Sequence, residues 1–365
     1  MYFKSVKAQT KSLSLTLYNN ISLINEIRAI PSKDDLTIEY LDISKFIDEN
    51  SILVEGLNFS SLVLTYVKDE SCKDDCNPNL IPYSITIKSK KPISKYIQLY
   101  YLSRNIQWIT NYFITLDKET LILNSWFNIT NTSGLDYINS NLKLISGYIN
   151  LSSSPVPYNS LLKSADLLNT VNSSLPIDDN QIYLIDNTYN ILNNSTTKIK
   201  NFTAKNVKYE KIYDFGYENT IADIVIKFFN SEENNLGIPL SLGTMNFYRY
   251  FNENLEFLGG SSINNIGINR EVSATIGKAF NVTVERIILS NTKYEDHSYK
   301  EVKYIIQNTS NEDVNILIGE PIFTPWVIEA STDPYSTDAN GNPIFSATVP
   351  EQSTKTITFS YKYNF

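Results

Sequence analysis

Apolar and polar residues alternate with a period of two along much of this chain, which is the pattern of β-strands with one buried face. The clearest stretch runs from Tyr96 to Ser152. Apolar positions alternate through 97–101, 109–116 and 121–129, and polar turns at 117–119 and 131–134 separate these runs. A further run begins at 142. The stretch therefore predicts neighbouring strands of a β-meander.

Two tryptophans lie in this stretch, Trp108 and Trp126, which are eighteen residues apart. Both fall within predicted strands that would pair or neighbour one another. Large aromatic rings in strands usually supply buried core area. We therefore expect both rings to lie in one core and not on a binding surface.

The same pattern divides the chain into three β modules. Residues 1–80 hold a predicted hairpin, with strands at 13–17 and 21–27 around Asn19-Asn20. Residues 81–290 form a central β-sandwich with an irregular excursion at about 153–203, where 161–171 could form a short helix and 183–185 a lone strand. Residues 291–365 hold five or more short strands, which favours an immunoglobulin-like sandwich. The predicted class is all-β, with serial sandwich modules.

The charge composition restricts the classes of molecule that the protein is expected to bind. The 365 residues carry a formal net charge of -8, which argues against an electrostatic grip on nucleic acid or anionic lipid. Lys88, Lys90, Lys91 and Lys95 form a small basic cluster, read as a solvated strand edge or, alternatively, a nucleic-acid site. The chain shows no signal-peptide pattern and no apolar run long enough for a membrane span. We expect a soluble product of cytoplasmic synthesis, without membrane insertion.

Asn, Ile, Lys, Tyr and Ser are abundant, whereas Gly, Pro, Ala and Arg are few. Such a bias is expected of an AT-rich coding sequence. This bias points to a large DNA virus, a low-GC bacterium or a protist parasite as the source of the chain. It says nothing about catalysis or binding.

The two cysteines, Cys72 and Cys76, lie in a polar loop. Three interpretations stay open: a small disulfide-closed loop, half of a metal site, or two free thiols. A zinc site normally takes four ligands, and the chain offers only these thiols and His297 as soft ligands. We therefore predict no metal.

Other candidate chemistry is weak. His297 is the single histidine, in an acidic turn, and no nucleophile elbow accompanies it. Adjacent acids at 74–75, 178–179 and 232–233 look like solvated charge, although a glycosidase would need a carboxylate pair. Asp338, Asn340 and Asn342 have alternate calcium-loop spacing without the glycine and acid that an EF-hand requires, so a turn is the better interpretation. We predict no catalytic residue and no cofactor.

Several segments resemble a known family. Ile106-Gln107-Trp108, Tyr112, Trp126, the turn Asn131-Thr132-Ser133-Gly134 and the strand 142–150 containing Gly147 follow its pattern, as do segments 15–19, 239–245 and 276–282. The chain resembles the domain-of-unknown-function 4139 family, the C-terminal domain of mucoidy-inhibitor-like proteins, without that family's long helical insertion. The resemblance implies a fold and no activity. It marks a structural signature at Trp108, Tyr112, Trp126, Asn131, Gly134, Gly147 and, in the last module, Trp326.

We therefore expect a non-enzymatic structural or assembly protein that acts through β-sandwich contacts with protein partners or its own copies, as in a capsid-associated component of a virus particle. The alternative is an extracellular or envelope-associated adhesion or glycan-binding module with Tyr-rich loops; a hydrolase ranks third. The working surface is expected in the loops at 69–80 and 153–203. Asn-x-Ser/Thr sequons, which leave glycosylation open, occur at Asn20, Asn58, Asn128, Asn131, Asn150, Asn172, Asn193, Asn194, Asn201, Asn281 and Asn308.

Overall fold

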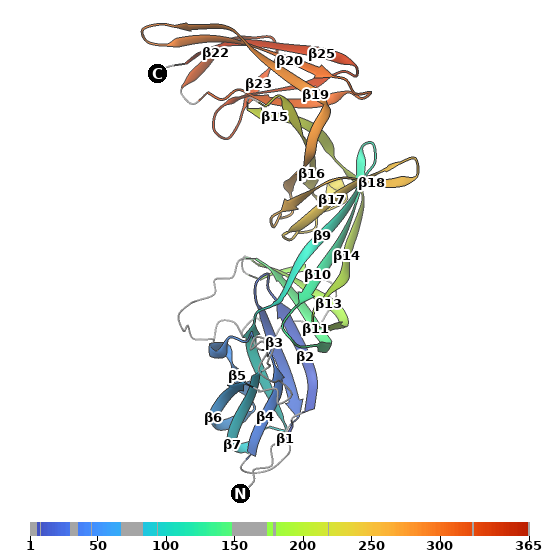
Figure 1. The fold of residues 1–365 in the computed structure, drawn as a ribbon, viewed down its shortest axis with the longest axis vertical. Coiled ribbons are helices and arrows are strands. Elements are labelled where there is room, and N and C mark those ends of the chain that lie inside the picture. Colours follow the sequence, from blue (N-terminus) through green and yellow to red (C-terminus); the bar gives the residue numbers. More distant parts are fainter. Residues whose placement is uncertain are drawn as a thin grey trace, which may run out of the picture. The chain divides into compact units, whose positions relative to one another are not determined.

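The computed structural model describes residues 6–7, 9–29, 36–44, 46–66, 83–92, 94–147, 174–177, 180–217, 219–322 and 325–363. Strands make up almost all of these residues, and the described part of the chain contains no α-helix (Figure 1). Short 3-10 turns occur at η1 (Glu49–Ser51) and η4 (Glu232–Asn234). The predicted all-β class is confirmed.

The chain forms two compact units rather than the three predicted modules. Unit 1 comprises residues 1–111 and 126–201, and unit 2 comprises residues 112–125 and 202–365. The division falls within β9 (Ile106–Leu116), β10 (Thr120–Asn131) and β14 (Ser195–Lys208). The predicted boundaries at 80 and 290 therefore do not coincide with the division between the units.

Unit 1 contains two sheets. The seven-stranded sheet has the order β12 (Ser174–Ile177), β13 (Asn180–Ile191), β11 (Tyr137–Ser146), β2 (Gln9–Leu17), β3 (Ser22–Ala29), β8 (Tyr96–Ser103) and β5 (Leu53–Glu55). The four-stranded sheet has the order β1 (Val6–Lys7), β4 (Leu36–Ile43), β7 (Tyr83–Pro92) and β6 (Leu57–Tyr66). Strands β2 and β3 form the predicted antiparallel hairpin. Apolar side chains from both sheets share one core.

A charged cluster lies inside this core, and we call Glu26, Arg28, Tyr40 and Tyr101 the Glu26 cluster. Arg28 donates from Nε and Nη2 to Glu26 Oε2 at 2.8 and 2.5 Å, and the Tyr101 hydroxyl donates to Oε1 at 2.8 Å. The Arg28 guanidinium also lies 4.7 Å from the centre of the Tyr40 ring. Burial and the nearby Glu26 charge raise the pKa of Tyr101. The carboxylate thus neutralises a buried arginine.

Unit 2 holds most of a five-stranded sheet with the order β14, β10, β9, β17 (Gly243–Phe251) and β18 (Asn254–Ile263). One face of this sheet packs on β16 (Ile221–Asn230) and β19 (Arg270–Lys293). The shared core includes Tyr112 and Leu123 from the five-stranded sheet and Phe228 and Val272 from the other two strands. The opposite face of β17 and β18 is half-buried along most of β17 and exposed near the tip of the hairpin.

A nine-stranded sheet completes unit 2, with the order β22 (Trp326–Ser331), β25 (Ser353–Tyr363), β20 (Ser298–Asn308), β19, β16, β15 (Glu210–Tyr217), β21 (Val314–Gly319), β24 (Pro343–Val349) and β23 (Tyr335–Thr337). Its two ends enclose one core, in which Phe345 of β24 meets Phe359 of β25 with ring centroids 4.5 Å apart. The sheet thus folds over itself as a sandwich. Strands β15, β16 and β19 precede residue 291, so the predicted last module is incomplete without them.

A second charged cluster lies in this sandwich, and we call Glu320, Arg286, Tyr304 and Tyr361 the Glu320 cluster. Glu320 is 1% exposed. Its carboxylate accepts from Arg286 Nη2 and Nε at 2.5 and 2.9 Å, and from the hydroxyls of Tyr304 and Tyr361 at 2.6 and 3.0 Å. Burial, followed by the Glu320 charge, raises the pKa of both tyrosines. The carboxylate has four donors, which compensates its removal from water.

Two sequence expectations need correction. The predicted excursion at 153–203 is regular where it is described, because 174–177, 180–191 and 195–203 belong to β12, β13 and β14, and the predicted lone strand at 183–185 is part of β13. The cause is the exposure of polar side chains along β13 and β14, which hides the alternation of apolar residues. The predicted helix at 161–171 lies outside the described residues. Lys88, Lys90 and Lys91 lie on β7, which has neighbours on both sides, so this part of the basic cluster is not on a sheet edge, and Lys95 lies in the bend before β8.

Asparagine takes the usual place of glycine in the turns. Of the ten described non-glycine residues with positive φ, all except Glu253 and Gln352 are asparagines. Asparagine tolerates this region better than other side chains. The abundance of asparagine, predicted only as a coding bias, therefore also has a structural use.

Candidate functional site

The predicted signature residues Trp108 and Tyr112 are buried and hydrogen-bonded. Trp108 Nε1 donates to the Leu17 carbonyl at 2.9 Å, and its ring meets Phe127 edge-on with centroids 5.5 Å apart. The Tyr112 hydroxyl donates to the Ser241 carbonyl at 2.8 Å. Trp108 belongs to the hydrophobic core of unit 1 and Tyr112 to a hydrophobic core of unit 2, so neither residue presents a binding surface.

Trp126 does not share the Trp108 core, contrary to the prediction. Its side chain is 36% exposed, whereas its neighbour Phe127 is 2% exposed. Adjacent residues of a strand point to opposite faces, so only one of the two rings can enter the core. Trp326 of β22 is half-buried and donates from Nε1 to the Gly341 carbonyl at 2.9 Å.

Asn131 builds the predicted turn at 131–134. It is fully buried, donates from Nδ2 to the carbonyls of Leu135 and Ile191 at 2.7 and 2.9 Å, and accepts from the Ser133 amide at 3.0 Å. Gly134 completes the turn with φ at +88°. The side chain of Asn131, the acceptor asparagine of a sequon, is therefore engaged in internal hydrogen bonds.

The same arrangement recurs at Asn308, which the sequence interpretation missed. Asn308 is 1% exposed, and its Nδ2 donates to the carbonyls of Glu312, Val349 and Pro350 at 2.9, 3.2 and 2.9 Å. Its Oδ1 accepts from the Ser310 amide at 3.0 Å. The available signal was the repeated tripeptide Asn-Thr-Ser.

Gly147 follows β11 and has φ at +155°, and a β-carbon there would collide with the side chain of Asn180. Its place in the signature therefore reflects a close approach of two chain segments. Cys72 and Cys76 lie outside the described residues, so their three interpretations stay open.

The structure also places the other candidate residues, His297 and Asp338. His297 Nδ1 lies 2.7 Å from Asp296 Oδ1 in the turn between β19 and β20, and its ring stacks on Tyr294. The contact with His297 lowers the pKa of Asp296. Asp338 Oδ1 accepts from the backbone amides of Asn340 and Asn342, both at 2.8 Å, which is a turn geometry. No group of three or more His, Cys, Asp or Glu residues suited to a metal occurs within the described ranges.

An exposed apolar surface lies on the hairpin of β17 and β18. Asn252 and Glu253 join the strands with φ of 47° and 68°, a two-residue turn that matches the strand twist. We define the hairpin face as the exposed or half-buried apolar and aromatic side chains on one face of this hairpin and of the adjoining strands, namely Phe113, Ile122, Tyr248, Tyr250, Leu255 and Phe257. Tyr250 and Phe257 are 64% and 59% exposed. An exposed apolar group of this kind marks an interaction site.

Three rings of the hairpin face form a row across β9, β17 and β18. Phe113 stacks on Tyr248 with centroids 4.1 Å apart and planes inclined by 17°, and Phe257 packs against Tyr248 at 5.4 Å and 58°. A stacked ring has one face covered by its neighbour. Tyr248 therefore does not present a free flat face, which is what stacking on a sugar ring would require.

The two edges of the five-stranded sheet differ in charge. Strand β14 carries four exposed lysines and no acid. Strand β18 carries no Lys, Arg or Pro, and its residues Asn254–Leu258 are all exposed. Lysine on an edge strand opposes pairing with another strand. Among the described strands only β17 pairs with β18, so this edge is open and lacks such protection.

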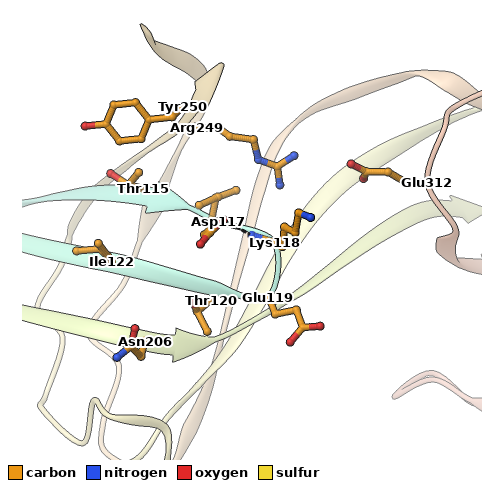
Figure 2. Close-up of a pocket in the computed structure, with 11 residues that line it drawn as sticks. Thr115, Asp117, Lys118, Glu119, Thr120, Ile122, Asn206, Arg249, Tyr250 and Glu312 are labelled. Carbon is orange, nitrogen blue, oxygen red and sulfur yellow. Dashed lines mark hydrogen bonds between the residues drawn. The ribbon is translucent and has the colours of Figure 1, made fainter. Parts of the chain in front are cut away.

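A cleft of about 900 Å³ adjoins the hairpin face at the turn between β9 and β10 (Figure 2). Asp117 donates its amide to the Thr120 carbonyl at 2.8 Å to close this turn. The cleft is lined by Thr115, Leu116, Asp117, Lys118, Glu119, Thr120, Ile122, Asn206, Arg249, Tyr250 and Glu312. Ile122 and Tyr250 belong to both the cleft and the hairpin face, so the two surfaces are continuous.

No protein-family model matches this chain, and no significant match occurs among curated proteins. Within the described residues, no helix combines the length and the apolar character that crossing a bilayer requires.

Proposed function

We propose that this chain is a non-enzymatic assembly protein that associates with protein through the hairpin face and the open edge of β18. The observation that carries the proposal is the exposure of Leu255, Phe257 and Tyr250 along an edge without lysine. Burial of apolar side chains favours association, and an open strand edge can pair with a strand of another chain. The AT-rich composition makes a virus particle the assembly in which to look first.

The test uses the full chain and material from its natural source. Native mass spectrometry of that material is expected to find the chain in a larger assembly. The double variant Leu255→Ser with Phe257→Ser should weaken association at least tenfold, measured by sedimentation velocity with the isolated assembly components. Val327→Ser is the matched control, because Val327 of β22 is 62% exposed and lies outside the hairpin face.

Two outcomes would overturn the proposal. One is a strictly monomeric chain that is absent from every purified particle. The other is a double variant that associates as strongly as the native chain.

Glycan binding is the alternative function for this surface: Tyr248 has one ring face covered by Phe113, whereas the rings of Tyr250 and Phe257 are exposed. Retention on a glycan array by the native chain, lost in Phe257→Ser, would favour that alternative. The resemblance to the domain-of-unknown-function 4139 family and the immunoglobulin-like description of the last module stay predictions. They concern the fold and add no activity.

A further inference from the structure

The two turns with the sequence Asn-Thr-Ser agree beyond their buried asparagines. Thr132 donates its amide to the Asn105 carbonyl at 2.8 Å, and Thr309 donates its amide to the Asn281 carbonyl, also at 2.8 Å. Each contact joins the end of one strand of a hairpin to the segment that leads into the other strand. The two turns therefore hold equivalent places in their hairpins.

A second pair of contacts joins each Asn-Thr-Ser turn to a distant turn. Asp136 Oδ1 accepts from the amide of Asn193 at 2.7 Å, and Asp313 Oδ1 accepts from the amide of Glu351 at 2.9 Å. Both aspartates stand directly before the strand that follows the turn, which is β11 in one case and β21 in the other. The same contact is thus made twice in the chain.

The distant turns match in their own conformation. Asn194 and Gln352 have φ of 52° and 49°. The next residue in each turn is a serine, and the hydroxyls of Ser195 and Ser353 donate to the carbonyl three residues earlier at 2.7 and 2.8 Å. Strands β14 and β25 begin at these serines. Contacts that agree over separate segments indicate one structure built twice.

The order of the strands repeats as well. Strands pair in the order β12, β13, β11, β2, β3 and β8 in unit 1, and in the order β23, β24, β21, β15, β16 and β19 in unit 2. In each set only the third and fourth strands pair in parallel. Strand β19 continues into a pairing with β20 and β20 with β25, as β9 pairs with β10 and β10 with β14. We therefore call 9–208 repeat 1 and 210–363 repeat 2.

Each repeat carries an insertion at the same place. The insertion lies between β3 and β8 in repeat 1, where it supplies β4, β6 and β7, and between β16 and β19 in repeat 2, where it supplies β17 and β18. Each repeat also contains a long hairpin, which we call its arm. The arm of repeat 1 is β9 with β10, and the arm of repeat 2 is the part of β19 after residue 281 with β20.

The insertion of repeat 2 covers the arm of repeat 1. In unit 2, β17 pairs with β9, and Tyr112 of this arm is 1% exposed. The arm of repeat 2 has no such cover among the described strands, because beyond residue 284 strand β19 pairs only with β20. Ile288, the counterpart of Tyr112 along the arm, is 48% exposed, and its neighbour Leu289 is 50% exposed.

The insertion of repeat 1 in turn has an open edge. Its strand β6 is the last strand of the four-stranded sheet, and among the described strands only β7 pairs with it. Strand β6 is 10 residues long and has no charged residue and no proline, which are the features that usually protect an edge. Phe59 and Val63 on it are 41% and 48% exposed. One arm and one insertion are thus joined within the chain, and one of each is not.

We propose that the arm of repeat 2 binds a second copy of this chain, whose strand β6 pairs with the edge of β19 at 285–292 and covers Ile288 and Leu289. The repeat identifies the occupant, because an insertion covers the other arm. Backbone pairing at an open edge supplies affinity. The two surfaces differ, so the contact is head-to-tail and can continue from copy to copy into a ring or a filament. Neither strand belongs to the hairpin face, so this contact goes beyond the proposed function.

Sedimentation velocity of the full chain over a range of concentrations tests the contact. The native chain should form dimers and larger species as its concentration rises. Leu289→Lys on the arm and Val63→Lys on β6 should each weaken this association at least tenfold, because lysine on an edge strand opposes pairing. Ile268→Lys is the matched control, since Ile268 is 45% exposed and lies outside both strands. It should associate as the native chain does.

Mixing the two lysine variants separates a broken contact from a misfolded chain. Each variant keeps the half of the contact that the other has lost. The mixture should therefore form one-to-one pairs that grow no further, although each variant alone stays largely monomeric.

A native chain that stays monomeric by itself would overturn the inference. So would unchanged association of either lysine variant, or a mixture that forms no pairs. The double variant Leu255→Ser with Phe257→Ser should self-associate as the native chain does, and a loss there would assign the self-contact to the hairpin face instead. A native chain that joins its natural assembly without self-association would refute the head-to-tail contact alone and leave the proposed function intact.

Discussion

Replacing Glu320 with glutamine should strongly destabilise unit 2. The substitution keeps the shape of the side chain and removes the negative charge that neutralises Arg286. It also replaces one carboxylate oxygen, which accepts hydrogen bonds, by an amide nitrogen, which cannot. Breaking a buried ion pair by removing one partner costs about 3–5 kcal/mol, so we expect a loss of about 3 kcal/mol in the free energy of unfolding.

Hydrogen exchange read by mass spectrometry is the suitable assay, because two units make a single unfolding transition an unsafe assumption. Peptides from β20 and β25 report on the Glu320 cluster, and peptides from β3 and β8 in unit 1 serve as an internal reference. Glu329→Gln is the matched control, since Glu329 is exposed and pairs with Lys362 at 3.0 Å. It should cost less than about 1 kcal/mol.

A second substitution tests the cause. If the unpaired charge is responsible, Arg286→Met added to Glu320→Gln should lose less stability than Glu320→Gln alone, because no buried charge is then left without a partner. The reasoning would be refuted if Glu320→Gln cost no more than Glu329→Gln. It would also be refuted if adding Arg286→Met increased the loss.

Three further predictions follow from the buried polar groups. The pKa of each tyrosine in the Glu320 cluster is raised, so the contribution of these tyrosines to stability is complete below their ordinary pKa of about 10 and is lost as the pH rises above it. Above a pH of about 10 the free energy of unfolding should fall by about 1.4 kcal/mol per pH unit for each tyrosine. Hydrogen exchange and an absorbance titration of the tyrosines would measure this loss. In a glycosylating host, Asn131 and Asn308 should stay unmodified in the folded protein, and a glycan found on either by peptide mass spectrometry would contradict their burial. Gly134→Ala should cost roughly 1 kcal/mol because of its positive φ, whereas Gly267→Ala, with open space around it, should cost less in the same denaturation series.

Period-two alternation predicted the strands well where one face is apolar. The hairpin of β2 and β3 and the strands β9, β10 and β20 follow the pattern closely, because their buried residues are large and regularly spaced. Strand β13 was predicted only at 183–185 and most of β14 was missed, because their exposed positions are polar and mask the few buried ones. The parallel pairing of β15 with β21 joins residues about one hundred positions apart, which no local pattern indicates.

The candidate site could be predicted only in part. The exposed side chains of β18 look like any apolar strand in the sequence, and only the sheet order identifies them as an open edge. The working surface was expected in loops at 69–80 and 153–203, whereas the described apolar surface lies on a hairpin. Arg249 had one usable signal, because Met245, Phe247 and Arg249 alternate strictly and the charge therefore falls on the core side.

The asparagine turns also bear on how the protein ages. Asparagine is among the thermolabile residues, and hydrolysis of its amide leaves a carboxylate in its place. Each such event would add one negative charge to a chain that already carries a formal -8. These residues lie in tight turns, including Asn252 at the tip of the hairpin. Slow hydrolysis of asparagine would therefore change the protein first at its turns and beside the hairpin face.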